Sequence, residues 1–343
     1  MSGTFGMMKN DIRRTLSYNF NRKGTVKNKP HIFVIESTNH CNLNCMMCPR
    51  RHMTRKVEHM KLDTFKKIID QSKGFVYEVG LDLFGEPLMC PDIFNMIRYA
   101  KDSGIKNVAM STNATLLNES NAKKILESDL DLLVIDLDGY TKETYEKIRN
   151  GAKHDISVKN IMRFGEMKRE YEKQNKKVPF VYLQIIRMKE TENEIPEWIK
   201  FWEKYPFHLF VKKFNTWAQQ DDFVTSLAKN EQKVKPDVKR YPCAWLWEQM
   251  IFTVNGDVVP CCADYDSKII LGNVNDNTVE EIWYGEKYRR LRELHKKGNY
   301  PSICGKCIEW KGHNRFAIWK DMKFIKNISL WKYIMNRKKI FRM

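Results

Sequence analysis

Short runs of β-branched and aromatic residues recur along the first two thirds of the chain, and amphipathic stretches separate them. Runs of this length and composition are typical of β-strands. They predict six strands, at residues 31–37, 76–84, 107–112, 132–137, 180–186 and 208–214. Between the runs, apolar positions return with the spacing of helices. Helices are expected at residues 62–72, 91–104, 118–128, 155–175 and 194–204.

Strands that alternate with helices predict a parallel sheet with right-handed crossovers, as in an open or closed α/β barrel. Ligands of such a sheet lie at the carboxyl ends of its strands. Candidate binding residues are therefore expected in the loops that follow the strands. Cys41 fits this expectation, because it comes four residues after the first predicted strand.

The hydrophobic pattern changes near residue 241. From there, cysteines, prolines and turn residues become dense, and the alternation of strands and helices stops. A polar, charged stretch precedes this change. We therefore expect five segments along the chain. They are a basic N-terminal extension at 1–30, an α/β barrel at 31–215, a linker at 216–240, a small cysteine-rich domain at 241–310 and a basic, aromatic tail at 311–343.

Composition favours a folded cytoplasmic protein. With 343 residues, of which 42% are hydrophobic, the chain can bury an ordinary core. It has no apolar run of about 18 residues or more that could span a membrane, and its N-terminus has no apolar signal-peptide core. Because cytosolic thiols are kept reduced, the nine cysteines indicate metal binding or catalysis before disulfides.

Three of the cysteines lie close together in the stretch CNLNCMMC. Cys41, Cys45 and Cys48 have the spacing CxxxCxxC in a loop after a strand. Three thiolates can hold three irons of a 4Fe–4S cluster and leave the fourth iron open to another ligand. The alternative is a structural zinc site that takes a fourth ligand from elsewhere, such as His40 or His52.

CxxxCxxC after the first strand resembles the signature of the radical S-adenosylmethionine (SAM) superfamily. Three more segments resemble motifs of this family in the expected order: GEP at 85–87, STNA at 111–114 and LDG at 137–139, with Arg149 downstream. The resemblance spans residues 31–214 and implies a partial (β/α)6 TIM-like barrel. It also implies that the amino and carboxylate groups of SAM bind the open iron of the cluster.

The resemblance places the SAM site on the loops after the second, third and fourth strands. The residues expected to contact SAM there are Gly85, Glu86, Pro87, Ser111, Asn113 and Asp136. Asp136 stands where the family often has serine, and its carboxylate can accept hydrogen bonds from ribose hydroxyls. The alternative for Asp136 is a turn-forming residue at a strand end. Gln184 and Arg187 on the fifth strand are expected to meet SAM or substrate, unless strand alternation turns one of them toward a helix.

A second set of four cysteines follows the change in pattern: Cys243, Cys261, Cys304 and Cys307. The spacing C-x12-G-x4-C followed by CxxC resembles the SPASM extension of radical SAM enzymes, in its shortened Twitch form. Four thiolates imply one fully ligated auxiliary 4Fe–4S cluster, and a four-cysteine zinc ribbon is the alternative. Cys90 is expected to be a small buried apolar residue. Cys262 is expected to point away from its neighbour Cys261.

This layout of two clusters implies a 5′-deoxyadenosyl radical that abstracts hydrogen from a substrate carbon, with the auxiliary cluster accepting the second electron. The predicted function is therefore dehydrogenation of a sugar-like or aminocyclitol-like small molecule. The alternative is a maturase that modifies a peptide or a sulfatase. Asp264, three residues after Cys261, is a candidate base for the proton that the substrate loses. An acid in a turn also commonly bonds to its own backbone.

Basic charge is concentrated at the two ends of the chain. Residues 1–30 hold seven Lys and Arg against one acid, and residues 311–343 hold ten against one. The tail has aromatic and basic residues at near-helical spacing, which is typical of helices that bind a membrane surface or an anionic partner. Packing onto the protein itself is the alternative. A flavodoxin-type or ferredoxin-type electron donor is expected, whereas no groove-reading module indicates a nucleic-acid partner.

Overall fold

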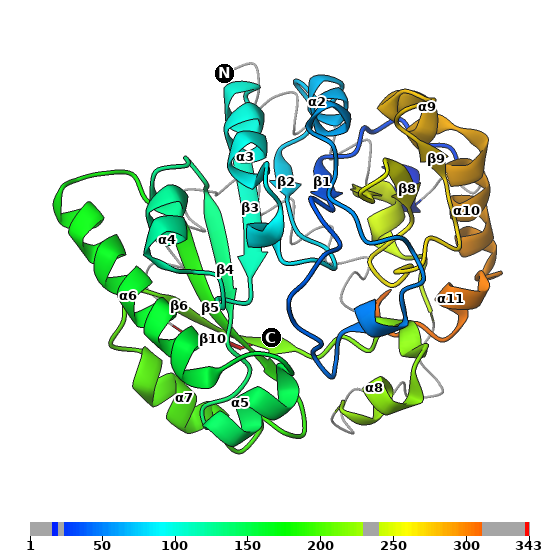
Figure 1. Cartoon of the computed structure of the whole chain (residues 1–343). Helices are drawn as coiled ribbons and strands as arrows, with labels where there is room; N and C mark the ends of the chain where they lie inside the picture. Colours follow the sequence, from blue (N-terminus) through cyan, green and yellow to red (C-terminus); the bar gives the residue numbers. More distant parts are fainter. Residues whose placement is uncertain (1–15, 20–23, 229–239, 311–339, 343) are drawn as a thin grey trace.

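The architecture comes from a computed structural model, which describes residues 16–19, 24–228, 240–310 and 340–342. One sheet runs through the molecule, with the strand order β10-β6-β5-β4-β3-β2-β1-β7-β8-β9 (Figure 1). The strands from β1 to β6 are parallel and lie side by side in chain order. This arrangement confirms the partial α/β barrel that the sequence predicts.

Each of the six predicted strands is present, although some are shorter than expected. Their bounds are β1 (Ile32–Ile35), β2 (Glu78–Gly80), β3 (Asn107–Thr112), β4 (Leu132–Asp136), β5 (Phe180–Arg187) and β6 (His208–Lys213). The predicted second strand, 76–84, keeps strand geometry only over its middle. Beyond Gly80 the chain leaves the sheet and forms the loop that carries the GEP segment.

The crossover helices lie along the outside of the curved sheet (Figure 1). They are α2 (Leu62–Asp70), α3 (Ile93–Asp102), α4 (Glu119–Leu126), α5 (Lys142–Ile148), α6 (His154–Lys173) and α7 (Ile195–Trp202). α5 is not among the helices that the sequence predicts. It is a short helix that begins where the Thr141 side chain accepts a hydrogen bond from the backbone N–H of Thr144.

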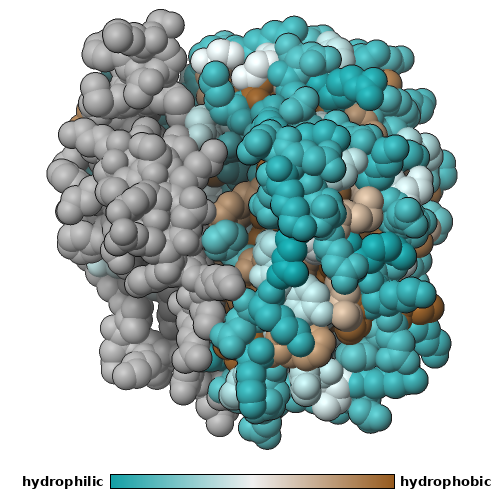
Figure 2. All heavy atoms as spheres, turned by 90° about the vertical axis from the view of Figure 1, so that its left-hand side faces the viewer, coloured by the Kyte–Doolittle hydropathy of each residue, from teal (hydrophilic) through white to brown (hydrophobic). Residues whose placement is uncertain are grey.

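Alternation along the strands separates a helix-facing side from an inner side. Val79, Met110 and Leu133 are buried beneath the helices, whereas their neighbours in sequence are only partly buried. On the inner side, a ring of polar residues occupies the carboxyl ends of the strands: Asp82, Ser111, Asp136, Gln184 and Lys212. Outside the barrel, the polar sides of the helices give the mainly hydrophilic surface of Figure 2, interrupted by smaller hydrophobic areas.

The cysteine-rich domain continues the same sheet. It contains η5 (Ala244–Trp247), β7 (Gln249–Phe252), β8 (Asp257–Val259), β9 (Gly272–Asn273), α9 (Val279–Tyr284), α10 (Glu286–Lys297) and α11 (Ser302–Gly305). β7 adds in parallel to β1, and β7 and β8 form an antiparallel hairpin. Gly256, the glycine of C-x12-G-x4-C, lies in the hairpin turn with φ of +88°. A side chain at this position would be strained, which explains the glycine.

Part of the predicted N-terminal extension packs onto this domain. The Tyr18 hydroxyl donates a hydrogen bond of 2.8 Å to the carbonyl oxygen of Pro242, and its ring meets that of Trp247 edge-on at 5.3 Å. Farther along, the Trp283 indole N–H donates to the carbonyl oxygen of Asn28 at 2.7 Å. These described residues of the extension are therefore part of the core.

The predicted linker and tail are described only in part. Within 216–228, the chain forms η3 (Trp217–Gln219) and α8 (Asp222–Ser226), and residues 229–239 lie outside the described part. At the end of the tail, β10 (Ile340–Arg342) is a strand and not part of a helix, and it pairs in parallel with β6. The free edge of β6 offers unpaired backbone groups, which explains why the chain adds a strand there. The rest of the tail, 311–339, lies outside the described residues. Within the described ranges, no helix is both long and apolar enough to cross a membrane.

Candidate active site

The loop after β1 brings the three cysteines of CxxxCxxC together. Cys45 is 7% exposed, and Cys41 and Cys48 are partly buried. Cys48 precedes η1 (Pro49–His52), and its backbone N–H donates to the carbonyl oxygen of Cys45 at 3.1 Å. Burial raises the pKa of each thiol, and the pKa of Cys45 rises to about 12. Repulsion from neighbouring thiolates adds to the rise for Cys45 and Cys48, and the Glu86 carboxylate adds to it for Cys41. A bound cation would offset both costs, so the donor set fits an iron cluster.

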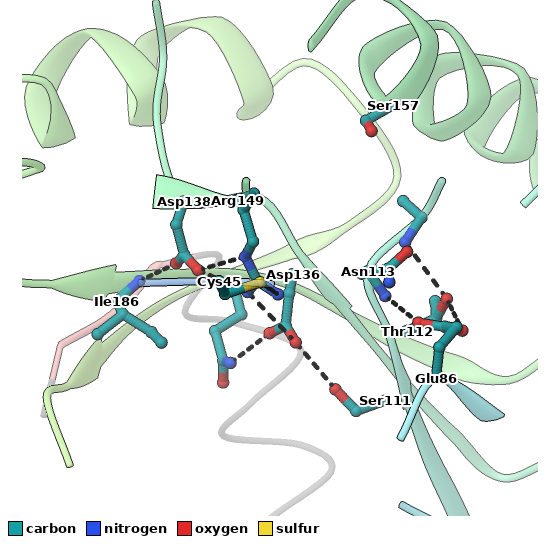
Figure 3. A network of polar contacts seen from close by, with 12 residues as sticks. Cys45, Glu86, Ser111, Thr112, Asn113, Asp136, Asp138, Arg149, Ser157 and Ile186 are labelled. Atoms are coloured by element: carbon teal, nitrogen blue, oxygen red, sulfur yellow. Dashed lines mark hydrogen bonds and ion pairs between the residues drawn. The ribbon is translucent and has the colours of Figure 1, made fainter. Parts of the chain in front are cut away.

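A buried ion pair supports this loop from the strand β4 side. Arg149 donates to Asp138 from Nε at 2.8 Å and from Nη2 at 2.5 Å, and its Nη1 lies 3.9 Å from the Cys45 sulfur (Figure 3). The other Asp138 oxygen accepts the backbone N–H of Ile186 at 2.7 Å. Arg149 therefore places a fixed positive charge beside a cluster cysteine.

The GEP segment crosses directly over the start of the cysteine loop. A Cβ at Gly85 would lie 2.2 Å from the carbonyl oxygen of Thr38, so only glycine fits. The next residue, Glu86, is 2% exposed and accepts hydrogen bonds from the Thr112 hydroxyl at 2.7 Å and the Asn113 N–H at 2.8 Å. Pro87 then starts η2 (Pro87–Met89). The side chain of Glu86 thus joins the GEP loop to the STNA turn.

Asn113 in turn connects the STNA turn to the cysteine loop. Its Nδ2 lies 3.9 Å from the Cys41 sulfur and donates to the Asn42 side chain at 3.1 Å. Asn113 and Glu86, both expected at the SAM site, therefore lie in one network that reaches Cys41. Figure 3 shows the part of this network in which Thr112 and Asn113 donate to Glu86.

Asp136 lies at the centre of a second set of polar contacts. Its carboxylate accepts from Ser111 Oγ at 3.2 Å and from Gln184 Nε2 at 2.5 Å, and lies 3.5 Å from Arg149 Nη2 (Figure 3). Three of the expected SAM residues, Ser111, Asp136 and Gln184, are thus brought together across β3, β4 and β5. Arg187 differs, because it forms an ion pair of 3.5 Å with Glu192 after β5.

The four cysteines of the second set line one pocket in the C-terminal domain. Cys243 precedes η5, Cys261 follows β8, and Cys304 and Cys307 flank the end of α11. Desolvation raises the pKa of all four thiols, and repulsion from other thiolates adds to the rise for Cys243, Cys261 and Cys304. Four convergent thiols fit a fully ligated iron–sulfur cluster.

Cys262 lines the same pocket, which corrects the expectation that it points away. That expectation assumed strand alternation, but β8 ends at Val259 and both cysteines lie in the following turn. Cys90 is 3% exposed, as expected for a small buried residue. Across the described part of the chain, no group of three or more His, Cys, Asp or Glu side chains is arranged to hold a single metal ion.

Asp264 is buried three residues after Cys261 and holds a turn. It is 2% exposed, and its two carboxylate oxygens accept the backbone N–H groups of Lys268 and Ile269, each at 2.8 Å. Burial raises the pKa of this carboxyl. These bonds agree with the alternative that Asp264 bonds to the backbone of its own turn. The role of Asp264 as a base stays a prediction.

Two contacts near the clusters are not predicted by the sequence patterns. The ion pair joins Asp138 of the LDG segment to Arg149 at the end of α5, and the sequence signal for it is the presence of Arg149 downstream of LDG. Trp217 donates from its indole N–H to the carbonyl oxygen of Met47, between two cluster cysteines, at 2.8 Å. Positive φ angles occur at Trp217, Ala218 and Gln219. No periodicity or motif in the sequence predicts this backbone conformation.

Two family models match successive parts of the chain. The radical SAM superfamily model matches residues 35–201, which hold Cys41, Cys45 and Cys48. The model of the SPASM iron–sulfur cluster-binding domain matches residues 243–308, which begin at Cys243 and include Cys307. Each match covers one of the two cysteine sets.

Curated relatives resemble the chain over different lengths. The tungsten-containing aldehyde ferredoxin oxidoreductase cofactor-modifying protein of Pyrococcus furiosus is 25% identical over 80% of this chain and 86% of its own. The AdoMet-dependent heme synthase of Methanosarcina barkeri is 35% identical, but over 36% of this chain and 35% of its own. The second likeness is therefore confined to about a third of each protein.

Solved structures share the fold at low sequence identity. Streptococcus suis SuiB bound to S-adenosylmethionine has a TM-score of 0.61 and 19% identity, and the match covers 83% of this chain and 73% of SuiB. Native anSMEcpe with bound AdoMet has a TM-score of 0.56 and 16% identity, with 89% of this chain and 100% of that chain covered. At these identities the likeness shows the fold.

Proposed function

Since the chain belongs to the radical SAM superfamily and carries a SPASM domain, we propose that it is an oxidoreductase that dehydrogenates a polar small molecule. When bound, SAM and the cluster at Cys41, Cys45 and Cys48 supply a 5′-deoxyadenosyl radical, and the auxiliary cluster supplies an electron acceptor. The observation that carries the proposal is the convergence of four cysteines on one pocket. A cluster with four protein ligands has no open iron for a substrate, which favours a role in electron transfer.

The inner side of the barrel supports a polar substrate. Asp82 follows β2, Asp136 ends β4 and Lys212 lies near the end of β6. These three strands are not neighbours in the sheet. Desolvation, followed by repulsion from Asp136, raises the pKa of Asp82 to about 6, and Lys212 opposes this rise. Asp136 and Lys212 therefore interact electrostatically with Asp82 across the inner face of the barrel. Carboxylates and an ammonium group in this position suit hydroxyl or amino groups of a substrate.

Loss of two hydrogens from a secondary alcohol balances as follows. One hydrogen atom leaves carbon, one proton leaves oxygen, and one electron leaves the resulting substrate radical. The chain must hold the reacting C–H in place, exclude water and accept the proton. Asp264 and the carboxylates of the inner ring are candidates for the proton, and Asp82, with a pKa near 6, is poised to accept it at neutral pH.

The name of the Pyrococcus furiosus relative supports a small substrate rather than a peptide, because it describes cofactor modification. Peptide modification stays the alternative function. Two fold neighbours have structures with peptides: SuiB bound to the precursor peptide SuiA, and anSMEcpe with bound AdoMet and the Cp18Cys peptide. Their sequence identities of 17% and 15% show the fold alone.

A substrate panel tests the proposal. The anaerobic, reduced protein would be incubated with SAM and amino sugars, aminocyclitols or polyols that carry deuterium on carbon. We expect 5′-deoxyadenosine that contains one deuterium and a product that has lost one deuterium from carbon and one hydrogen from oxygen. A product of unchanged oxidation state would contradict the dehydrogenase function. Turnover of a peptide instead, with no turnover of the panel, would favour the alternative.

A further inference from the structure

A histidine on the wall of the auxiliary pocket has one ring nitrogen without a partner among the described residues. His295 lies in the last turn of α10, is 2% exposed and lines the pocket beside the four cysteines. Its Nδ1 accepts the backbone N–H of Cys243 at 3.3 Å. Its Nε2 is buried and has no hydrogen-bond partner among the residues that the structure describes.

The bond to Cys243 fixes where the ring carries its proton. A neutral imidazole has one donor and one acceptor nitrogen. Because Nδ1 accepts a backbone N–H, the proton is on Nε2, which is therefore a donor. A buried donor without an acceptor destabilises the folded protein. Such a cost points to an acceptor that none of the described residues provides.

The groups around His295 hold the ring in place. The ring of Tyr300 meets it edge-on at 5.0 Å. Arg240 covers the other part of the pocket wall: its guanidinium lies 3.7 Å from the Tyr300 ring centroid and donates to the carbonyl oxygens of Gly305, at 2.8 Å, and Cys304. The imidazole therefore has a defined position on the pocket wall.

From this geometry we infer that His295 is a positioning residue that donates a hydrogen bond from Nε2 to a sulfur atom of the auxiliary cluster or of its cysteine ligands. Hydrogen bonds to the sulfurs stabilise the reduced cluster, which carries the more negative charge, and so raise its reduction potential. The inference rests on the proposed function, because a higher potential makes the cluster a better acceptor for an electron from the substrate.

The test uses the full chain with Cys41, Cys45 and Cys48 changed to alanine, so that only the auxiliary cluster is loaded. Redox titration followed by electron paramagnetic resonance gives its potential. For His295→Leu we expect the ratio of oxidised to reduced cluster at a fixed potential to rise about tenfold. This corresponds to a reduction potential that is lower by about 59 mV for a one-electron couple. His295→Gln keeps an amide donor and is expected to fall between wild type and His295→Leu. Tyr300→Phe keeps the ring and is the matched control, with no expected shift.

A second readout needs no substitution of His295. With 15N-labelled histidine, pulsed electron paramagnetic resonance of the reduced auxiliary cluster should show coupling to a histidine nitrogen. An unchanged reduction potential in His295→Leu would overturn the inference. If that variant fails to load iron, the absence of histidine coupling in the protein with His295 would overturn it instead. Either result leaves the proposed function intact. If the protein with four auxiliary cysteines binds no cluster at all, the proposed function itself fails.

Discussion

The indole N–H of Trp217 donates a hydrogen bond of 2.8 Å to the carbonyl oxygen of Met47. Met47 lies between Cys45 and Cys48, whereas Trp217 belongs to the segment that joins β6 to the C-terminal domain. The adjacent Ala218 lines the auxiliary pocket. One short turn thus contacts the cluster loop with one residue and the auxiliary pocket with the next.

Replacing Trp217 with phenylalanine should disturb the first cluster. The ring still packs on Phe84, whose centroid is 5.9 Å away, but the hydrogen bond is lost, at a cost of about 1 kcal/mol. We expect an altered electron paramagnetic resonance spectrum of the reduced SAM-binding cluster. Trp247→Phe is the control, because Nε1 of Trp247 has no partner among the described residues. Identical spectra for Trp217→Phe and wild type would argue against a role for this contact.

The ion pair between Arg149 and Asp138 predicts a large loss of stability. Both residues are buried, and Asp138→Asn would leave the Arg149 guanidinium with a weakened partner. We expect the free energy of unfolding to fall by about 3 kcal/mol, measured by urea denaturation. Asp155→Asn breaks an exposed ion pair with Lys142 and should change little. A loss for Asp138→Asn as small as for the control would mean that the charge beside Cys45 is held by other contacts.

Glu86 predicts a pH dependence of stability. Burial raises its pKa from 4.5 to about 7, although Asn113 and Thr112 donate hydrogen bonds that lower it. Between these two values the unfolded chain binds fewer protons than the folded one, so stability falls as pH rises. The expected loss from this group is about 3 kcal/mol across the window. Asp82, whose pKa is about 6 in the fold, adds to the loss with the same sign.

Glu86→Gln should flatten this dependence. The amide has no titration between pH 4.5 and 7, so the remaining slope comes from Asp82 and other groups. Urea denaturation at several pH values measures the slope, and Glu286→Gln, an exposed position, serves as control. An unchanged slope in Glu86→Gln would show that this carboxyl is ionised throughout the window.

Binding of the basic tail, residues 311–343, to a membrane surface stays a prediction. Vesicles that contain phosphatidylserine should float the protein at low salt and lose it at high salt. Deleting the tail is a poor test, because β10 pairs with β6 and would be lost. Changing lysines and arginines within 311–339 to glutamine tests the charge alone. Flotation that survives these changes would contradict binding through the tail.

The barrel could be predicted because its information is local. Each strand from β1 to β6 is a short apolar run with turn residues around it, and the polar groups of the site follow strand ends. Ser111, Asp136 and Gln184 meet because the carboxyl ends of parallel strands share one edge of the sheet. The positions of these three residues at the ends of successive predicted strands were therefore enough to predict that they meet.

Contacts between distant segments could not be predicted in this way. Tyr18 and Asn28 pack on the C-terminal domain, more than two hundred residues away in the chain, and no periodicity encodes that choice. The unpaired edge of β6 selected β10, although the residues of the tail have helical spacing. The hydrogen bond from the Cys243 backbone to the His295 ring likewise depends on how α10 packs. The spacing of the cysteines in the sequence does not predict it.

The most direct test of the central claim is to count iron and sulfide in the anaerobically reconstituted protein and in the Cys304→Ala, Cys307→Ala variant. We predict about eight irons in the wild type and about four in the variant, one 4Fe–4S cluster for each cysteine set. Cleavage of SAM driven by dithionite should persist in the variant. A wild type that holds about four irons and one zinc would contradict the account, since the C-terminal site would then be structural and the proposed electron acceptor would be missing.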